Sequence, residues 1–455
     1  MKTYAAGILS LLLATQAVAA PASPDAAKRI LKDSIAIPTV EGRGQVPKLA
    51  AYFAQVLRDA GFAASDIKIT PVGETATLVA TLQGRNPKLK PIAMLGHMDV
   101  VAANPADWTR DPFVPVEENG YIYGRGAADN KFDVAMMVAA LAELKHRGFK
   151  PERSILLILS GDEETSMAST QTLANQYRDI EFILNGDGGG GLLNEEGQPD
   201  YYNLQAGEKT YADIEIAFTN AGGHSSRPGA DNAIYRLSAA LDRLQNYRFA
   251  PQLNELTQAS LTIAAKQVGG ATGAALDRFL RNPQDAEAVA TIRSDPEYVG
   301  QIGTTCVPTM ANAGHAQNAL PQRAAVNINC RIFPGVPVAQ VVDELRRVVN
   351  DPAAQFTVLG APVASDASPL RKDVVKAVTK AVHARFPGLQ IAPSMSAGAT
   401  DSVYFRANGI PCYGVAGLFM KSSDDFSHGL NERAPVAAIP GALAHWDSLL
   451  HDLSK

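Results

Sequence analysis

The chain has 455 residues, a formal net charge of −5 and 46% hydrophobic residues. This length exceeds one ordinary domain core, so we expect two domains. The composition is that of a soluble globular protein. The slightly acidic balance and the lack of lysine or arginine runs argue against binding to nucleic acid or to anionic lipid.

Residues 1–20 have the pattern of a secretory signal peptide. Lys2 precedes an apolar segment over residues 8–13 and an Ala-x-Ala ending at Ala19. A membrane anchor is the alternative, but a spanning helix needs ~20 predominantly apolar residues, and polar residues at 15–16 interrupt this segment. No later segment is long and apolar enough to span a membrane. We therefore expect cleavage near Ala19, export to the periplasm or the medium, and no membrane attachment afterwards.

Strands and helices alternate along the N-terminal part of the chain. Apolar runs predict strands at residues 67–70, 77–82, 91–101, 155–159 and 182–184, and apolar residues at helical spacing predict helices within 24–61 and over 133–147 and 169–176. An apolar run without alternation is typical of a strand buried on both faces of a parallel sheet. We therefore predict an α/β domain with a mostly parallel sheet flanked by helices.

The middle of the chain has a different pattern. Residues 211–219 and 326–332 alternate between apolar and polar side chains, as expected of strands with one face in water. Residues 249–298 are expected to be mostly helical and to carry no chemistry. We predict a small inserted α+β domain, called the lid domain below. The predicted domains are a discontinuous catalytic domain over 21–206 and 364–455, and a lid domain over 207–363.

The chain has three cysteines, Cys306, Cys330 and Cys412. Export permits disulfides, and an odd count leaves at least one thiol unpaired within the chain. Cys306 and Cys330 belong to one region and could form a bridge. The alternative is that all three are small buried apolar residues.

Three acidic residues, Asp162, Glu163 and Glu164, follow the apolar run at 155–159. In open parallel sheets, ligands bind just beyond the carboxyl ends of the strands. Adjacent carboxylates at such a place repel one another unless a cation or a proton holds them. The alternative interpretation is a solvated acidic turn, and the rest of the chain has to decide between the two.

Further acids and histidines stand at expected strand ends and in loops. The set comprises His97, Asp99, Asp129, Glu163, Glu164, Asp187 and His428. Imidazoles and carboxylates together are the ligands of a hydrolytic zinc site, and no thiolate is placed for a structural one. Two histidines and three carboxylates suffice for two metals if one carboxylate bridges them. Because consecutive side chains leaving a strand diverge, Glu164 can bind a metal while Glu163 serves as general base.

The order of these residues resembles the motif order of the dizinc exopeptidase family. That family includes glutamate carboxypeptidase, yeast carboxypeptidase S, aminoacylase and succinyl-diaminopimelate desuccinylase. The resemblance covers nearly the whole mature chain. It is carried by His97 with Asp99, the Gly124-Arg125-Gly126 turn before Asp129, Gly161 to Glu164, Asp187 and His428. It implies a catalytic α/β domain with an inserted lid or dimerisation domain, in agreement with the predicted elements.

The resemblance also implies which residues bind metal. One Zn²⁺ would be held by His97 and Asp187, and a second by Glu164 and His428. Asp129 would bridge the two ions. Co²⁺ and Mn²⁺ are the alternative metals. Taken singly, these residues have plainer interpretations, such as a surface histidine, a helix cap or a turn residue.

Two acids in the set would act without binding metal. By the resemblance, Glu163 would be the general base and Asp99 would orient His97. Asp162 keeps the plainer interpretation of a turn residue or a supporting carboxylate. This division gives each of the adjacent glutamates a separate task, Glu164 on the metal and Glu163 on the proton.

The resemblance extends to the substrate end of the site. His224 matches a lid histidine that stabilises the oxyanion, often from the partner subunit. If His224 acts in this way, the protein forms a homodimer through the lid domain. Arg331 resembles an arginine that binds a substrate carboxylate. Asn318 matches an asparagine near the scissile carbonyl. Gly398 and Thr400 belong to a carboxylate-binding loop, although a second glycine common in the family is alanine at position 399.

These features predict an exported metallohydrolase that cleaves an amide bond next to a free carboxylate. A carboxypeptidase or dipeptidase is the first interpretation. An N-acyl-amino-acid hydrolase is the alternative, because the same site cuts any amide that releases an amino acid. A catalytically inactive binding relative is a more distant alternative, against which the complete ligand set and Glu163 both argue.

Overall fold

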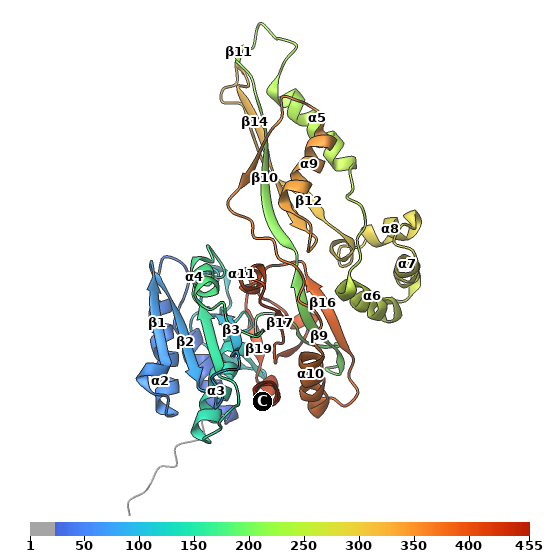
Figure 1. Ribbon diagram of the computed structural model, residues 1–455. Coiled ribbons are helices and arrows are strands. Elements are labelled where there is room, and N and C mark those ends of the chain that lie inside the picture. The colour runs from blue at the N-terminus through green and yellow to red at the C-terminus, as the bar shows by residue number, and fades with distance from the viewer. Residues whose placement is uncertain (1–22) are drawn as a thin grey trace, which may run out of the picture.

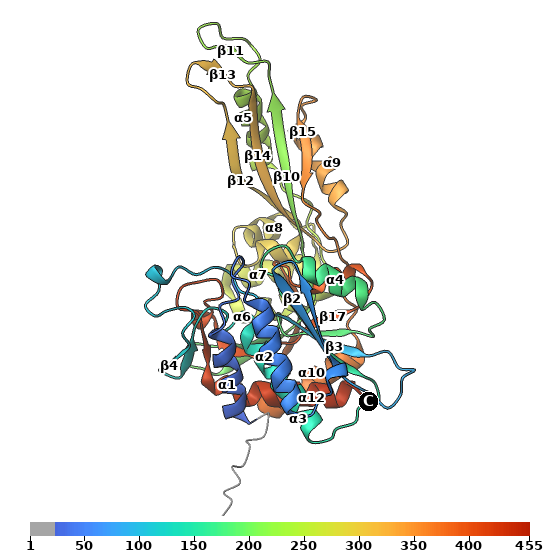
Figure 2. The same ribbon diagram turned by 90° about the vertical axis from the view of Figure 1, so that its left-hand side faces the viewer.

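The computed structural model describes residues 23–455, which form two parts (Figures 1 and 2). One part is a broad layered body, and the other is an elongated projection of strands and helices. The predicted signal peptide, residues 1–20, lies outside the described residues. Within residues 23–455, no helix has both the length and the apolar character needed to cross a membrane.

A ten-stranded sheet forms the centre of the broad part. Its strands are β1 (Ile67–Val72), β2 (Thr75–Leu82), β3 (Ile92–His97), β6 (Ile155–Ser160), β7 (Ile183–Asn185), β8 (Gly190–Leu193), β9 (Pro199–Glu208), β16 (Ile391–Ser396), β17 (Cys412–Gly414) and β18 (Phe419–Lys421). They run in the order β1-β2-β6-β3-β7-β17-β9-β8-β18, and β16 pairs with β9. The central neighbours β6, β3, β7 and β17 are parallel. The predicted α/β class with a mostly parallel sheet is confirmed.

Helices cover both faces of this sheet. One face carries α1 (Pro24–Ile35), α2 (Val46–Asp59), α3 (Lys131–His146), α10 (Lys372–Arg385) and α12 (Ile439–Leu453), and the other carries α4 (Ala168–Gln176) and α11 (Ser402–Ala407). Strand β6 shows why its sequence lacks alternation. Leu157 and Leu159 pack into the first apolar core, and Leu156 and Ile158 pack into the second. Both faces of the strand are therefore buried.

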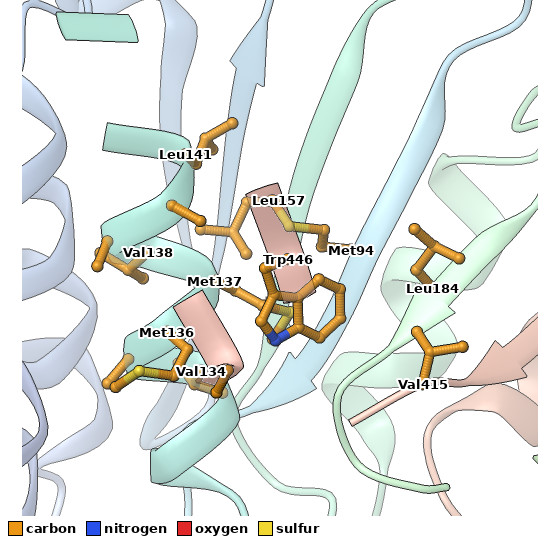
Figure 3. Packing of buried hydrophobic residues seen from close by; sticks show 14 of the residues in the cluster. Met94, Val134, Met136, Met137, Val138, Leu141, Leu157, Leu184, Val415 and Trp446 are labelled. Atoms are coloured by element: carbon orange, nitrogen blue, oxygen red, sulfur yellow. The ribbon is translucent and has the colours of Figure 1, made fainter. Parts of the chain in front are cut away.

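Helix α3 is enclosed on nearly all sides, since most of its residues are buried. Trp446 of α12 lies between α3 and the sheet, beside Met137 and Leu157 (Figure 3). Its indole nitrogen donates a hydrogen bond of 2.8 Å to Oδ1 of Asp133, a buried carboxylate in the first turn of α3. Burial raises the pKa of Asp133 to about 6. These contacts fix the start of α3, which directly follows the loop that carries Asp129.

The lid domain contains a four-stranded antiparallel sheet. Its strands, in sheet order, are β12 (Thr305–Ala313), β14 (Arg323–Ile332), β10 (Thr210–Thr219) and β15 (Gln355–Leu359). Helices α5 (Ala233–Asn246) and α9 (Val338–Val349) pack on its apolar face. Cys306 and Cys330 are register partners on β12 and β14 and form a disulfide, while Cys412 is buried and free. Of the two interpretations of the cysteines, the bridge is confirmed.

A helical cluster completes the lid domain. It consists of α6 (Glu255–Val268), α7 (Gly270–Arg281), α8 (Ala286–Arg293) and the 3₁₀ turn η3 (Val299–Ile302). It has its own apolar core, centred on Leu276, Phe279 and Ile292. Helix α6 also contacts β16 of the large sheet. The stretch predicted to be a helical elaboration therefore lies against the catalytic domain.

Short elements connect these units. The remaining strands are β4 (Val116–Glu118), β5 (Tyr121–Tyr123) and β19 (Arg433–Pro435) in one small sheet, and β11 (Gly223–His224) with β13 (Ala319–Leu320) in another. The remaining 3₁₀ turns are η1 (Ala64–Asp66), η2 (Pro105–Asp107), η4 (Ser422–Asp424) and η5 (Val436–Ala438). The pair β11 and β13 forms the far tip of the projection (Figure 2).

Candidate dinuclear metal site

Three neighbouring parallel strands bring the predicted ligands together. His97 is the last residue of β3, Glu163 and Glu164 follow β6, and Asp187 follows β7. Strand β3 pairs with both β6 and β7, so the carboxyl ends of all three meet at one edge of the sheet. Asp129 reaches this edge from the loop before α3. His428 reaches it from the loop after η4.

Asp129 lies between the two histidines. Its Oδ1 is 3.1 Å from Nε2 of His97, and its Oδ2 is 3.3 Å from Nε2 of His428. Oδ1 of Asp187 is 3.7 Å from the same nitrogen of His97. Oε2 of Glu164 is 2.9 Å from the same nitrogen of His428. The side chains thus form two groups that share one carboxylate, which is the arrangement that a bridging ligand between two metals requires.

The site gathers more acids than bases. Burial, together with nearby carboxylates, raises the pKa of Glu163 well above its ordinary value and that of Asp187 to about 7. Burial opposes the charging of His97, but Asp187, Asp129 and Asp99 outweigh it and raise its pKa strongly. The hydrogen bond to Asp129 raises the pKa of His428 to about 9. Crowded acids of this kind are stabilised by a cation.

Divalent cations fit this donor set. No lysine or arginine within residues 23–455 forms an ion pair with the carboxylates of Asp129, Glu164 or Asp187, whose ion-pair partners are His97 and His428. Ligand atoms of His97, Asp129 and Glu164 lie within 4.8 Å of one another, and so do those of His97, Glu163 and Asp187. Imidazole and carboxylate ligands without a thiolate suit zinc and the metals near it.

The Asp99 carboxylate supports the turn that carries the two glutamates. Its Oδ1 accepts the backbone N–H of Glu163 at 3.1 Å, and its Oδ2 accepts that of Glu164 at 3.0 Å. The same carboxylate is 3.6 Å from Nδ1 of His97, which lies 3.1 Å from the Asp99 carbonyl oxygen. Residue 99 therefore orients His97 through its backbone and the glutamates through its side chain.

Asp162 has the structural role that the sequence suggested for it. Its carboxylate accepts hydrogen bonds from the backbone N–H groups of Ala168 and Ser169, at 2.8 and 3.0 Å. It also accepts the hydroxyl of Ser166. These bonds close the turn between β6 and α4. Asp162 is consequently a turn residue, and its neighbours Glu163 and Glu164 are held toward the site.

Glu432 is a functional support that the sequence analysis did not identify. Its buried carboxylate forms an ion pair of 2.6 Å with Arg125, which is also buried. It accepts the backbone N–H groups of Gly126, Ala128 and Asp129 at 2.9 to 3.0 Å. Arg125 in turn donates to the carbonyl oxygen of His428. This pair therefore ties together the loops that carry the bridging carboxylate and the second histidine.

We expect Glu432→Gln to lower metal affinity by about 10- to 100-fold, because it loosens both ligand loops while keeping all the metal ligands. It should also lower the free energy of unfolding by about 3–5 kcal/mol, since Arg125 is left as an unpaired buried charge. Zinc titration calorimetry and thermal unfolding measure the two effects. Glu118→Gln, which breaks the exposed pair with Arg110, is the control. Unchanged zinc affinity in Glu432→Gln would contradict the assignment.

Asp401 is a second buried acid that the sequence analysis left unassigned. It accepts the hydroxyls of Ser160, at the end of β6, and Thr170. Burial raises its pKa to about 7. The adjacent Thr400 is also buried, and its hydroxyl donates to Glu208 and accepts from Asn185 at 3.0 Å. Thr400 thus supports the strand end before Asp187.

Arg331 and Gly398 lie together at the junction of the lid and catalytic domains. The Arg331 guanidinium donates 3.2 Å to the carbonyl oxygen of Ala397 and stacks over the ring of Tyr211. No carboxylate of residues 23–455 forms an ion pair with Arg331. The Gly398 N–H donates to the hydroxyl of Ser396 at 3.0 Å. Arg331 therefore has no ion-pair partner beside this loop, whereas the Gly398 amide already donates a hydrogen bond.

His224 and Asn318 lie together, but at the far tip of the lid domain. His224 is in β11, and the carbonyl oxygen of Asn318 accepts the N–H of Ser225 at 3.0 Å. His224 is exposed, and its Nδ1 is 2.8 Å from the Ser226 hydroxyl. The tip points away from the sheet edge that carries the metal ligands (Figures 1 and 2). Within one chain, the fold does not bring these two residues to the metal site.

A cavity of about 570 Å³ opens beside the predicted ligands. Asp129 and Asp187 line one end, and Leu261 and Ala264 of α6 line another part. Tyr298 contributes to the wall as well. Half of the other lining residues carry amides or aliphatic hydroxyls, namely Asn203, Gln205, Ser260, Gln267, Gln301, Ser394, Ser396 and Thr400. The helical cluster, to which the sequence analysis assigned no chemistry, thus forms a wall of the candidate site.

The matching protein-family model covers most of this architecture. The model of Peptidase family M20/M25/M40 matches residues 93–452, from β3 to the last helix. The chain belongs to this family. The matched range includes every predicted metal ligand and Glu163. The resemblance inferred from the motifs is therefore confirmed.

Members of the M20 family with curated descriptions are similar over most of the chain. The mouse (Mus musculus) N-fatty-acyl-amino acid synthase/hydrolase PM20D1 is 30% identical over 440 residues, which cover 90% of this chain and 84% of that protein. The probable carboxypeptidase S-like 2 of Dictyostelium discoideum is 29% identical over 378 residues, or 79% of this chain and 71% of that protein. The described activities of these two proteins, hydrolysis of N-acyl amino acids and carboxypeptidase activity, are among those that the sequence predicted for this chain.

Solved M20 structures share the fold. The M20 family metallo-carboxypeptidase Sso-CP2 from Sulfolobus solfataricus aligns with a TM-score of 0.70 and 18% identity, over 94% of this chain and 99% of that one. YXEP of Bacillus subtilis, described as a dinuclear metal binding peptidase from the M20 family, aligns with a TM-score of 0.62 and 15% identity, over 94% and 97%. The chain is thus an M20-type metallohydrolase with a candidate metal site.

Proposed function

We propose that this protein is a dizinc hydrolase that cleaves the amide bond next to a free carboxylate, as a carboxypeptidase or dipeptidase. The position of Asp129 between His97 and His428, with one oxygen toward each, carries the proposal. Zn²⁺ is the proposed metal on the chemistry of the ligands, and Co²⁺ or Mn²⁺ would fit the same donor set. When bound, two such cations polarise the scissile carbonyl and acidify the attacking water.

Glu163 is placed to move the proton. It is buried, and its backbone is held by Asp99 in the turn after β6. In the proposed reaction its carboxylate accepts a proton from the attacking water and then gives that proton to the leaving nitrogen. Its raised pKa, caused by burial, suits a group that is protonated and deprotonated in one cycle. Glu164, next in sequence, is turned toward His428 and remains available to a metal.

The free carboxylate of the substrate is proposed to pair with Arg331. Ala397, which accepts a hydrogen bond from Arg331, lies between Ser396 and Thr400, and both of these line the cavity. The guanidinium is therefore at the edge of the cavity, and no carboxylate of the described chain forms an ion pair with it. Among residues 23–455, no lysine, arginine or histidine lines the cavity itself. This distribution supports a substrate orientation with the carboxylate at Arg331 and the acyl side in the cavity.

We expect Arg331→Ala to raise KM for substrates with a free C-terminus by about tenfold or more, since a charge-assisted bidentate contact is lost. C-terminally amidated substrates lack the carboxylate, so their slower cleavage should be affected little. Steady-state kinetics on matched free and amidated peptides measure the difference. Arg323→Ala, on the same strand but paired with Glu215, is the control. An unchanged KM for the free acid would remove Arg331 from the site.

The lining of the cavity favours a peptide as the acyl side of the substrate. Amides, hydroxyls and the acids Glu297 and Asp425 predominate, and apolar side chains such as Leu261 and Ile263 are fewer. A peptide or an amino-terminal ammonium group can use such partners. The 30% identity to PM20D1 supports a second candidate, the hydrolysis of N-acyl amino acids.

A substrate panel distinguishes the two candidates. The zinc-loaded protein should be assayed with dipeptides, tripeptides, N-acetyl amino acids and N-dodecanoyl amino acids that share one C-terminal residue. A carboxypeptidase cleaves both peptide lengths, and a dipeptidase cleaves only the shorter. A preference for either N-acyl series establishes the second candidate. Equal cleavage of free and amidated C-termini would refute the proposed requirement for a carboxylate.

We also propose that the protein is exported to the periplasm or the medium and acts as a homodimer. Export is supported by the sequence pattern of residues 1–20 and by the Cys306–Cys330 disulfide, because disulfides persist in oxidising compartments. The N-terminus of the protein recovered from cell fractions should lie at Ala20 or Pro21. A dimer is supported by the position of His224 at the far tip of the lid domain, away from the metal ligands of its own chain. Recovery of an unprocessed cytoplasmic form would overturn the first of these proposals.

A further inference from the structure

A second cavity lies in the lid domain, apart from the metal site. It occupies about 550 Å³ and is lined by residues of the lid sheet, α5 and the turn η3. Figure 1 shows the lid sheet and α5. Its walls are mainly apolar and include Leu241, Leu244, Phe249, Ile302, Ile328 and Leu345. Its size is within the range of pockets that enclose small molecules. Nothing in the proposed reaction uses this cavity.

Two arginines without acidic partners stand at this cavity. Arg248 and Arg293 both line it, and neither forms an ion pair with any residue of 23–455. Arg248 donates to the carbonyl oxygens of Gln245 and Tyr247, and Arg293 donates to that of Phe249. Burial and the charge of Arg248 lower the pKa of Arg293. Two cations that face no acid form a binding position for an anion.

We call this second cavity the lid cavity, and the cavity beside Asp129 and Asp187 the catalytic cavity. The turn η3 separates the two. Tyr298 and Gln301 line the catalytic cavity, whereas Val299 and Ile302, in the same turn, line the lid cavity. A molecule in the lid cavity would therefore contact the opposite side of η3 from the substrate. It would not touch the metal ligands. The two cavities are distinct sites that share a wall.

We propose that the lid cavity binds an amphiphilic anion, a fatty acid, with its carboxylate at Arg248 and Arg293 and its chain among the apolar side chains. The combination of an apolar interior and unpaired guanidinium groups matches both ends of such a ligand. Guanidinium groups pair with carboxylates in a bidentate geometry. Each methylene group buried in the interior strengthens binding, and two added carbons should tighten it about tenfold until the cavity is full.

Calorimetric titration of the full-length, metal-loaded protein with dodecanoate below its aggregation limit tests this proposal. We expect one molecule per chain, weaker binding of octanoate, and still weaker binding of dodecanol, which lacks the carboxylate. Arg248→Glu should reduce dodecanoate affinity at least tenfold and leave dodecanol binding unchanged. Arg281→Ala, which removes an exposed positive charge at the end of α7, is the matched control.

Two outcomes would overturn the proposal. One is dodecanoate affinity that is the same in Arg248→Glu and in the parent protein. The other is displacement of dodecanoate by a slowly cleaved substrate analogue, with no effect of Arg248→Glu, because this would place the fatty acid in the catalytic cavity. Leu244→Trp, which fills the lid cavity without changing charge, should abolish binding of both dodecanoate and dodecanol. Thermal unfolding of each variant shows whether it is folded.

Discussion

Glu163→Gln is expected to keep both metals bound and to lower kcat by about 10²–10⁴-fold, the range for loss of a general base. Glutamine has the shape of glutamate but cannot accept the proton of the attacking water. Glu164 forms an ion pair with His428, whereas Glu163 has no ion-pair partner among residues 23–455 although it lies beside His97 and Asp187. Metal content measured by mass spectrometry, together with steady-state kinetics, tests both halves of this expectation.

Glu164→Ala is the comparison variant. It removes a predicted ligand one residue away, so it should lose metal occupancy as well as activity. Excess zinc should restore part of its activity, whereas it should restore none to Glu163→Gln. If Glu163→Gln hydrolyses substrate as fast as the parent, or if it loses metal as Glu164→Ala does, the division of roles between the two glutamates is wrong.

The fold could be predicted well where one physical cause dominated. Strand β6 is a run of apolar residues because both of its faces are buried, and this pattern identified the parallel sheet. The alternation in β10 and β14 follows from a sheet with one covered face. The surroundings of helix α3 were harder to predict, because the helix is enclosed on nearly all sides and apolar spacing does not show this. The path of α6 onto β16 depends on tertiary packing, which periodicity does not encode.

The metal ligands could be predicted because they stand at strand ends, whose place in a parallel sheet is fixed by topology. Glu432 and Asp401 could not, since their partners are distant in sequence. Glu432 pairs with Arg125, and Asp401 accepts the hydroxyl of Ser160. The nearest signal in the sequence was the charge of Glu432 close after His428. Composition alone does not say which buried acid supports a loop and which binds a metal.

The position of His224 leads to a prediction about two chains. His224→Ala and Glu163→Gln should each be nearly inactive, the first because loss of an oxyanion-stabilising group costs about 10²–10³-fold in kcat. If His224 acts in the partner's site, the mixed dimer regains one complete site. That site combines Glu163 of the His224→Ala chain with His224 of the Glu163→Gln chain. Random exchange of equal amounts should then recover about one quarter of the parent activity.

The recovery should follow the exchange of subunits and not the mere presence of both proteins. Activity should rise with the rate at which the two variants form mixed dimers, measured with differently labelled chains. A mixture of Glu163→Gln with Glu163→Gln, His224→Ala is the control, because neither chain supplies the base and no complete site can form. A monomeric protein with full activity would place His224 outside the reaction. Mixed dimers that form but show no recovered activity would mean that His224 does not act in the partner's site.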